Sequence, residues 1–129
     1  MNFENLETYK GLIKLNNISE TGFLKKSCAF KFFEDATCFT KTILKNIIID
    51  SENHLESEFF DISVYAYMTV YVTTNISLLS KDKVEVTHKL FLLNQNNNND
   101  DQILSHIRLI LNSSNIDKLP KVNINNLSG

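Results

Sequence analysis

The strongest constraint on this chain is the stretch Phe59–Thr74, in which side chains of opposite character alternate. Strand side chains point to opposite faces in turn, so the alternation predicts one long β-strand. β-Branched and aromatic residues dominate it, and no Gly or Pro interrupts it. One face is aliphatic and suits a core, formed by Phe60, Ile62, Val64, Ala66, Met68, Val70 and Val72. The other face is mixed and carries a tyrosine stripe at Tyr65, Tyr67 and Tyr71.

A second strand is predicted at Val84–Leu93, where apolar and polar residues again alternate. It follows the short polar turn Ser80–Lys83. A parallel crossover needs a dozen or more residues, so this short turn favours an antiparallel hairpin.

Two further strands are expected upstream. Thr42–Asp50 is one, followed by an acidic, polar loop at Ser51–Glu58. Lys26–Glu34 is the other, since it alternates around Cys28, Phe30 and Phe32. Leu6–Ile18 is ambiguous and could supply a fifth strand.

The character of the chain changes after the strands. Asn94–Asp101 is a polar run that predicts an exposed loop. Gln102–Leu111 then has apolar residues at helical spacing and predicts an amphipathic α-helix. Leu119–Leu127 reads as an extended tail around the single Pro. We therefore expect one α+β domain over residues 1–129: a four-stranded antiparallel β-meander followed by one amphipathic C-terminal helix and an extended tail.

Composition narrows the possible partners and the compartment. Hydrophobic residues make up 43% of the 129 residues, which suits a folded domain, and a net charge of -2 argues against nucleic acid. Met1–Gly11 lacks the features of a signal peptide, and no stretch reads as a membrane helix. We expect a soluble, cytoplasmic protein with no membrane insertion. Cys28 and Cys38 are then expected as buried reduced thiols, with a disulfide as the alternative.

Motifs for chemistry are scarce. The three histidines lie at no local metal-binding spacing, and the few glycines form no phosphate-binding loop. Four acidic residues in one segment could supply a carboxylate pair, although such a segment is more often solvated surface. They are Glu52, Glu56, Glu58 and Asp61. We therefore expect no catalytic residues, no metal, no cofactor and no enzymatic activity.

The tyrosine stripe allows two interpretations. It could be a sheet face half-covered by loops or a neighbouring subunit, or it could be a binding surface, since Tyr offers a large contact area. One short helix cannot cover so long a sheet, which leaves apolar surface for self-association or a ligand. The expected polypeptide-binding residues are Tyr65, Tyr67, Tyr71, Phe30, Phe32 and Phe91.

The order of the expected parts resembles the SecB-like export chaperones. The resemblance rests on His106–Leu111 followed by Leu119–Ile124, and on the strand pair Phe59–Thr74 and Val84–Leu93 upstream. It implies a homo-oligomer, a dimer or tetramer, that holds unfolded polypeptides for export or for a specific partner such as a toxin. The small helix and Gly-containing segment of that family are replaced here by the Asn-rich loop.

Three functions follow from these expectations. The first is a non-enzymatic, SecB-like molecular chaperone for unfolded or partner polypeptides. The second is a small structural or interaction protein, such as a phage or mobile-element accessory factor, that forms an obligate homodimer. The third is a minor enzyme or small-ligand binder with a pocket between helix and sheet, using His88 with a carboxylate.

Overall fold

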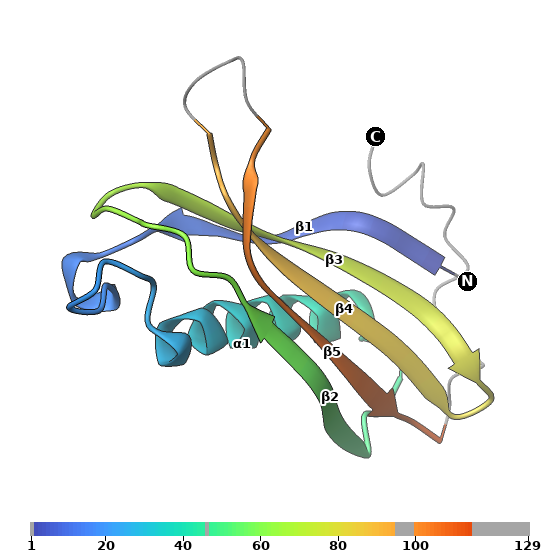
Figure 1. Ribbon diagram of the computed structural model, residues 1–129. Helices are drawn as coiled ribbons and strands as arrows, with labels where there is room; N and C mark the ends of the chain where they lie inside the picture. The colour runs from blue at the N-terminus through green and yellow to red at the C-terminus, as the bar shows by residue number, and fades with distance from the viewer. Residues whose placement is uncertain (1, 46, 95–99, 115–129) are drawn as a thin grey trace.

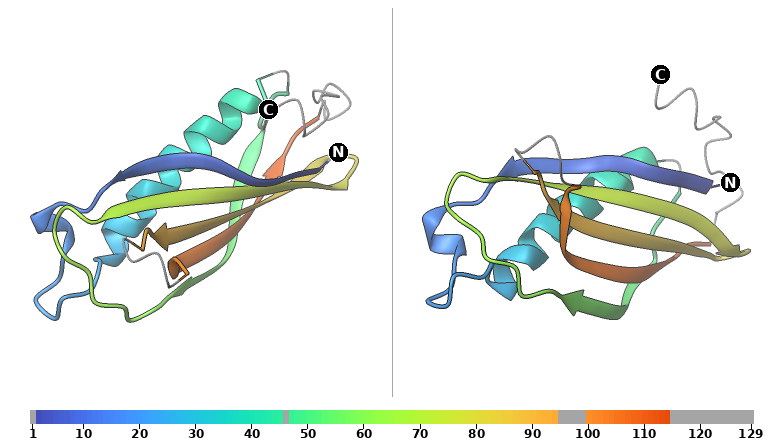
Figure 2. Two further views of the ribbon diagram at one scale, coloured as in Figure 1. Left: turned by 90° about the horizontal axis from the view of Figure 1, so that it is seen from above. Right: turned by 45° about the horizontal axis from the view of Figure 1, so that its top comes forward.

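The computed structural model describes residues 2–45, 47–94 and 100–114, which form a five-stranded antiparallel sheet with one long helix on one of its faces (Figure 1). The strands lie in the order β1-β3-β4-β5-β2. Two further views show the sheet curving around the helix (Figure 2). In chain order the elements are β1 (Asn2–Leu12), the 3-10 turn η1 (Leu15–Asn17), α1 (Lys26–Ile43), β2 (Ser51–Phe59), β3 (Thr69–Ser80), β4 (Lys83–Leu92) and β5 (Gln102–Asn112).

This architecture corrects the expected fold class. The sheet has five strands rather than four, and the helix lies between the first two strands of the chain rather than after the last one. The expected tail at Leu119–Leu127 lies outside the described residues.

The helix α1 occupies the segment where a strand was predicted at Lys26–Glu34. The strand prediction rested on a period of two around Cys28, Phe30 and Phe32, and this period is wrong. The buried residues instead recur at helical spacing and include the adjacent pair Phe32 and Phe33, which a strand would point to opposite faces. They are Ala29, Phe32, Phe33, Ala36, Thr37 and Thr40.

Strand β5 occupies the segment where the C-terminal helix was predicted. It lies inside the sheet between β4 and β2, and it buries residues on both faces. Leu109 and Leu111 are fully buried on the α1 face, while Ile110 between them is only 7% exposed. Burial on both faces produces a run of apolar residues that mimics the stripe of an amphipathic helix.

The long predicted strand Phe59–Thr74 is divided between two strands. β2 ends at Phe59, β3 begins at Thr69, and residues 60–68 connect them. Tyr67 in this connection has a φ of 71°, and its N–H donates to the Ile13 carbonyl at 2.6 Å. Strand β2 covers the whole of the expected acidic loop Ser51–Glu58, and no strand forms at Thr42–Asp50 among its described residues. The sequence of β2 shows no alternation of apolar and polar residues, because β2 is an edge strand with almost no buried side chains.

The predicted antiparallel pairing around the Ser80–Lys83 turn is confirmed, although its first strand is β3 at Thr69–Ser80 rather than Phe59–Thr74. The two strands pair antiparallel from Val70 opposite Leu92 to Ser80 opposite Lys83. Their alternate residues face α1 and form the centre of the core, where Val70, Val72, Val84, Val86 and Leu90 are fully buried.

Two smaller features of the structure concern the cysteines and the helix length. Cys28 and Cys38 are both free thiols, although Cys28 is only half-buried and Cys38 is exposed. Among the residues that the structure describes, no helix is long and apolar enough to cross a membrane.

Candidate functional site

A groove between α1 and β2 is a candidate ligand-binding feature of this fold. β2 pairs only with β5, so its far edge has no partner strand among the described residues. Two hollows of about 190 and 370 Å³ lie along it, and Phe30, His54 and Ile107 line both. Phe33 from α1 also lines the smaller hollow. The groove therefore has an apolar wall from α1 and β5 and a polar wall from β2.

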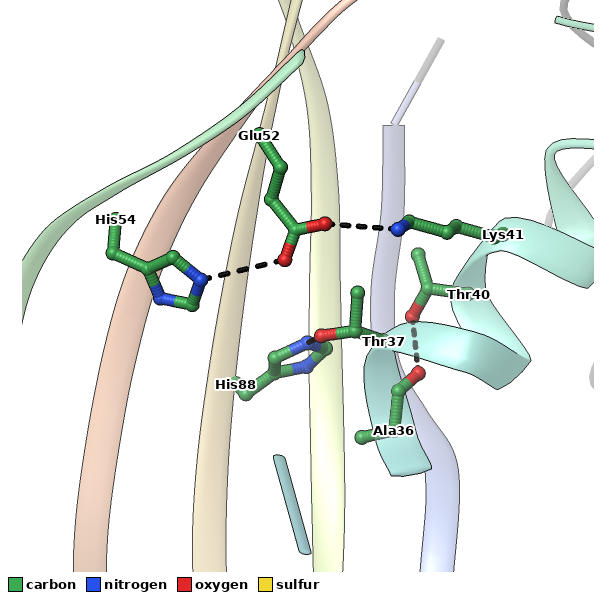
Figure 3. A network of polar contacts seen from close by, with 7 residues as sticks. All are labelled: Ala36, Thr37, Thr40, Lys41, Glu52, His54 and His88. Carbon is green, nitrogen blue, oxygen red and sulfur yellow. Dashed lines mark hydrogen bonds and ion pairs between the residues drawn. The ribbon is translucent and has the colours of Figure 1, made fainter. Parts of the chain in front are cut away.

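Two residues of the polar wall, Glu52 and His54, form a chain of charged or ionisable groups with Lys41 of α1 (Figure 3). Lys41 from α1 donates to Glu52 Oε2 at 2.8 Å, and His54 Nε2 lies 3.3 Å from Glu52 Oε1. Burial raises the pKa of Glu52, but the hydrogen bond and charge of Lys41, aided by His54, outweigh it and hold the pKa below its ordinary value. Glu52 is therefore ionised at neutral pH and can orient the His54 imidazole.

The strand geometry explains why these two side chains share a face. Glu52 and His54 are two residues apart, so both point toward α1. A bulge follows His54, and beyond it two acidic residues form ion pairs on the opposite face of the sheet. Glu56 lies 3.2 Å from Arg108 Nε, and Glu58 lies 3.4 Å from His106 Nε2.

A second polar group lies behind the groove, within the core. Thr37 lines the smaller hollow, and its hydroxyl is 2.9 Å from Nε2 of the fully buried His88. The other ring nitrogen, Nδ1, is 2.7 Å from the Thr74 hydroxyl. Burial lowers the pKa of His88 to about 4, with only partial compensation from the charge of Glu52. His88 is therefore neutral at pH 7.

This arrangement suits general-base hydrolysis of a substrate with an apolar part. A histidine held by a carboxylate can take a proton from water when its second nitrogen is unprotonated. Glu34 lines the smaller hollow together with Glu52 and His54, so a second carboxylate faces the same space. No group of three or more metal-binding side chains occurs within the described part of the chain.

The six residues expected to bind polypeptide do not form one surface. They lie in four places. Phe30 lines the groove, and Phe32 is in the core, stacked on Tyr9 at 5.2 Å. Tyr71 and Phe91 stack on each other at 5.3 Å across β3 and β4.

The remaining two, Tyr65 and Tyr67, are exposed in the connection between β2 and β3. A binding role for the six residues stays a prediction, but the structure does not bring them together. His88, expected in one alternative as a pocket residue, is covered by Thr37.

Sequence reasoning missed the grouping of Thr37, Glu52 and His54. The sequence pattern indicates an acidic segment that includes Glu52 and a loop at Ser51–Glu58 that contains His54. Their spacing would have placed both on one face if Ser51–Phe59 had been recognised as a strand. The signal was absent because that strand is exposed on both faces.

Comparisons with known proteins identify the fold. The chain matches no sequence-family profile and no curated protein. It is similar to the solved structure of a hexameric broad specificity acyl-coenzyme A thioesterase, with a TM-score of 0.67, 6% identity, and coverage of 91% of this chain and 87% of that one. It is also similar to an acyl-CoA hydrolase from Staphylococcus aureus in complex with butyryl coenzyme A and coenzyme A, with a TM-score of 0.64, 9% identity, and coverage of 88% and 68%.

A 4-hydroxybenzoyl CoA thioesterase complexed with 4-hydroxybenzoyl CoA gives a TM-score of 0.59 at 11% identity, with coverage of 90% of this chain and 86% of that one. At these identities the likeness establishes the fold alone. The shared arrangement of five antiparallel strands curved around one helix is the hotdog fold.

These findings correct the expected resemblance to SecB-like chaperones. The solved structures named above are thioesterases or acyl-CoA hydrolases and none is a chaperone, so the expectations of a chaperone, of unfolded polypeptide as partner and of a non-enzymatic protein lose their basis. The alternative of an accessory factor that only builds a homodimer loses its basis for the same reason. The homo-oligomer that accompanied these expectations stays a prediction.

Proposed function

We propose that this protein hydrolyses acyl thioesters of coenzyme A. The observation that carries the proposal is the Glu52–His54 pair, which lies in a groove with an apolar wall. The hotdog fold supports it, because proteins named as acyl-CoA thioesterases share that fold across most of this chain. The proposal also accords with the third function considered from the sequence, an enzyme with its pocket between helix and sheet, although with different residues.

In the proposed reaction, His54 is the general base. Its Nε2–H donates to the Glu52 carboxylate, which leaves the Nδ1 lone pair free to accept a proton from water. The resulting hydroxide attacks the thioester carbonyl carbon, and a tetrahedral intermediate forms. When this collapses, the C–S bond breaks and the thiolate leaves as coenzyme A. The thiolate takes the proton back from His54, and the acyl group leaves as a carboxylic acid.

Each wall of the groove has a role in this proposal. The apolar side chains of Phe30, Phe33 and Ile107 would contact the acyl chain, and burial of its methylenes would contribute about 0.8 kcal/mol each. Lys41 would keep Glu52 ionised and fix its position, since a carboxylate held by a lysine cannot rotate freely. We place the reaction in the cytoplasm, as expected from the sequence, and the free thiols of Cys28 and Cys38 suit a reducing compartment.

The test is hydrolysis of a panel of acyl-CoA thioesters, from acetyl-CoA to palmitoyl-CoA, followed by a colorimetric assay of the released thiol. Glu52→Gln and His54→Asn should each lower kcat by about a hundredfold or more, because the first frees the imidazole and the second removes the base.

The opposite face of the sheet supplies matched controls on β2 and β5. Glu58 and His106 form a similar carboxylate–histidine pair at 3.4 Å, outside the groove. Glu58→Gln and His106→Asn should leave kcat within about a factor of two. No turnover of any thioester in the panel would contradict the proposal, as would equal effects of the two pairs of substitutions.

A further inference from the structure

One helix threonine uses its hydroxyl differently from its neighbours. Thr40 and Thr42 each donate to the carbonyl four residues back, at 2.8 and 3.1 Å, as threonines in helices commonly do. The Thr37 hydroxyl lies 2.9 Å from His88 Nε2 instead. Thr37 is only 6% exposed and lines the smaller hollow, so its oxygen lies between the groove and a buried imidazole.

The contact is the first of a chain of hydrogen bonds that crosses the core. His88 Nδ1 is 2.7 Å from the Thr74 hydroxyl, and Thr74 is 2.8 Å from the Thr8 hydroxyl. The last hydrogen bond of this series joins the Thr8 hydroxyl to the Val72 carbonyl oxygen at 3.4 Å, and it is the longest of the four. The series therefore runs from α1 through β4 and β3 to the edge strand β1.

The hydrogens in this chain can be assigned, because each hydroxyl has one and a neutral imidazole has one. His88 is neutral because burial lowers its pKa to about 4. If Thr8 donates to the carbonyl oxygen of Val72, Thr74 donates to Thr8, and Nδ1–H donates to Thr74. Thr37 then donates to the unprotonated Nε2. Every hydrogen has an acceptor, so this direction is favoured while no ligand oxygen lies within hydrogen-bond distance of the Thr37 hydroxyl.

The reverse direction frees one hydrogen for the groove. Thr8 then donates to Thr74, Thr74 donates to Nδ1, and Nε2–H donates to the Thr37 oxygen. The Thr37 hydrogen turns outward, and only the longest contact, to the Val72 carbonyl, is lost. A carbonyl oxygen bound in the smaller hollow would accept this hydrogen, and the reversal would again leave each hydrogen with an acceptor.

We propose that Thr37 donates its hydroxyl hydrogen to the carbonyl oxygen of the bound acyl thioester, and that the chain from Thr37 through His88 and Thr74 to Thr8 reverses its direction to allow this. The inference rests on the proposed function for its ligand. Thr37 is thereby a catalytic residue, because it touches the reacting carbonyl, while His88, Thr74 and Thr8 are positioning residues. A donor aimed at a carbonyl oxygen stabilises the negative charge that the oxygen gains in the tetrahedral intermediate.

The donor–acceptor direction of these hydrogen bonds can be measured without any ligand. Nitrogen-15 NMR of histidine-labelled protein at pH 7 reports which ring nitrogen of His88 carries the hydrogen. The free wild-type protein should show the Nδ1–H form. Thr8→Val removes the acceptor of the Thr74 hydrogen, so Thr74 should turn toward Nδ1 and His88 should show the Nε2–H form. Thr8→Ser keeps the hydroxyl and should match the wild type, and Thr8→Ala replaces Thr8→Val if that variant does not fold.

These spectra would overturn the proposal in either of two ways. The wild type could already show the Nε2–H form, or Thr8→Val could leave the Nδ1–H form unchanged. A role of Thr8 limited to packing would not move the hydrogen between the two nitrogens, so the spectra separate positioning from structure.

The role of Thr37 is tested by kinetics on the same acyl-CoA panel. Thr37→Val should lower kcat by about a hundredfold with a smaller change in KM, and Thr37→Ser should recover most of the loss. Equal rates for these two variants would overturn the donor role while leaving the hydrolase proposal intact. If the wild type hydrolyses no member of the panel, the proposed function fails and the donor role fails with it. The spectra of the free protein then still decide the direction of the chain.

Discussion

Burial of His88 should make the fold sensitive to mild acid. The imidazole is fully buried, and its direct partners Thr37 and Thr74 provide no countercharge. The charged or ionisable groups that act on it are Glu52 and His54, both on β2, and their effects oppose each other. Burial therefore decides the result and lowers the pKa of His88 from its ordinary value of 6.5 to about 4.

The sign of the effect follows from proton binding. Above about pH 6.5 His88 is neutral in both the folded and the unfolded chain, so it has no effect on the free energy of unfolding. Between pH 6.5 and about 4 the unfolded chain binds a proton that the folded chain does not, and stability falls as the pH falls. Below about pH 4 both forms are protonated and the loss is complete. Since a tenfold change in proton affinity corresponds to about 1.4 kcal/mol, the total loss is about 3 kcal/mol.

Urea denaturation of the wild type and of His88→Gln, at intervals from pH 7 to pH 4, measures this loss. Glutamine can hydrogen-bond to the same hydroxyls but does not titrate in this range. The wild type should lose about 3 kcal/mol more stability than His88→Gln over that interval. Glu52 and Asp101, whose pKa values are also lowered in the folded protein, are present in both proteins, so their acid effects largely cancel in the difference. Parallel stability curves for the two proteins would refute the reasoning.

Three further predictions concern aromatic side chains. Phe33→Ala should lower the free energy of unfolding by about 3 to 5 kcal/mol in urea titrations, because this ring is 1% exposed and belongs to the hydrophobic core that borders the groove. Phe30→Ala should cost much less stability, since the ring is 37% exposed, but in the acyl-CoA panel it should weaken the preference for longer chains. Tyr71→Phe should cost about 1 kcal/mol in thermal unfolding, because it removes a hydrogen bond to Asp101, which also accepts the Asn94 backbone N–H at 2.7 Å. An equal loss of stability in Phe33→Ala and Phe30→Ala would contradict the assignment of core and groove, and an unchanged melting temperature in Tyr71→Phe would contradict the role of its hydroxyl.

The sequence by itself determined the hairpin of β3 and β4. Its strands alternate because one face packs on α1 and the other does not, and their short polar turn excludes a parallel crossover. The local pattern therefore predicted the antiparallel pairing, but it placed the first strand at Phe59–Thr74, whereas β3 spans Thr69–Ser80.

The tertiary structure decided the remaining elements and the candidate site. β5 buries residues on both faces and β2 on almost none, and neither case leaves the period of two by which strands are recognised. α1 was missed because its aromatic residues also fit a short alternation, and only the sheet beneath it selects the helical period. The groove depends on all three missed elements, because Phe30 from α1, His54 from β2 and Ile107 from β5 line both of its hollows. Glu52 approaches Lys41, and Thr37 approaches His88 51 residues away, only because the chain places α1 against the inner face of the sheet. Such contacts between distant residues follow from packing, and no local period in the sequence encodes them.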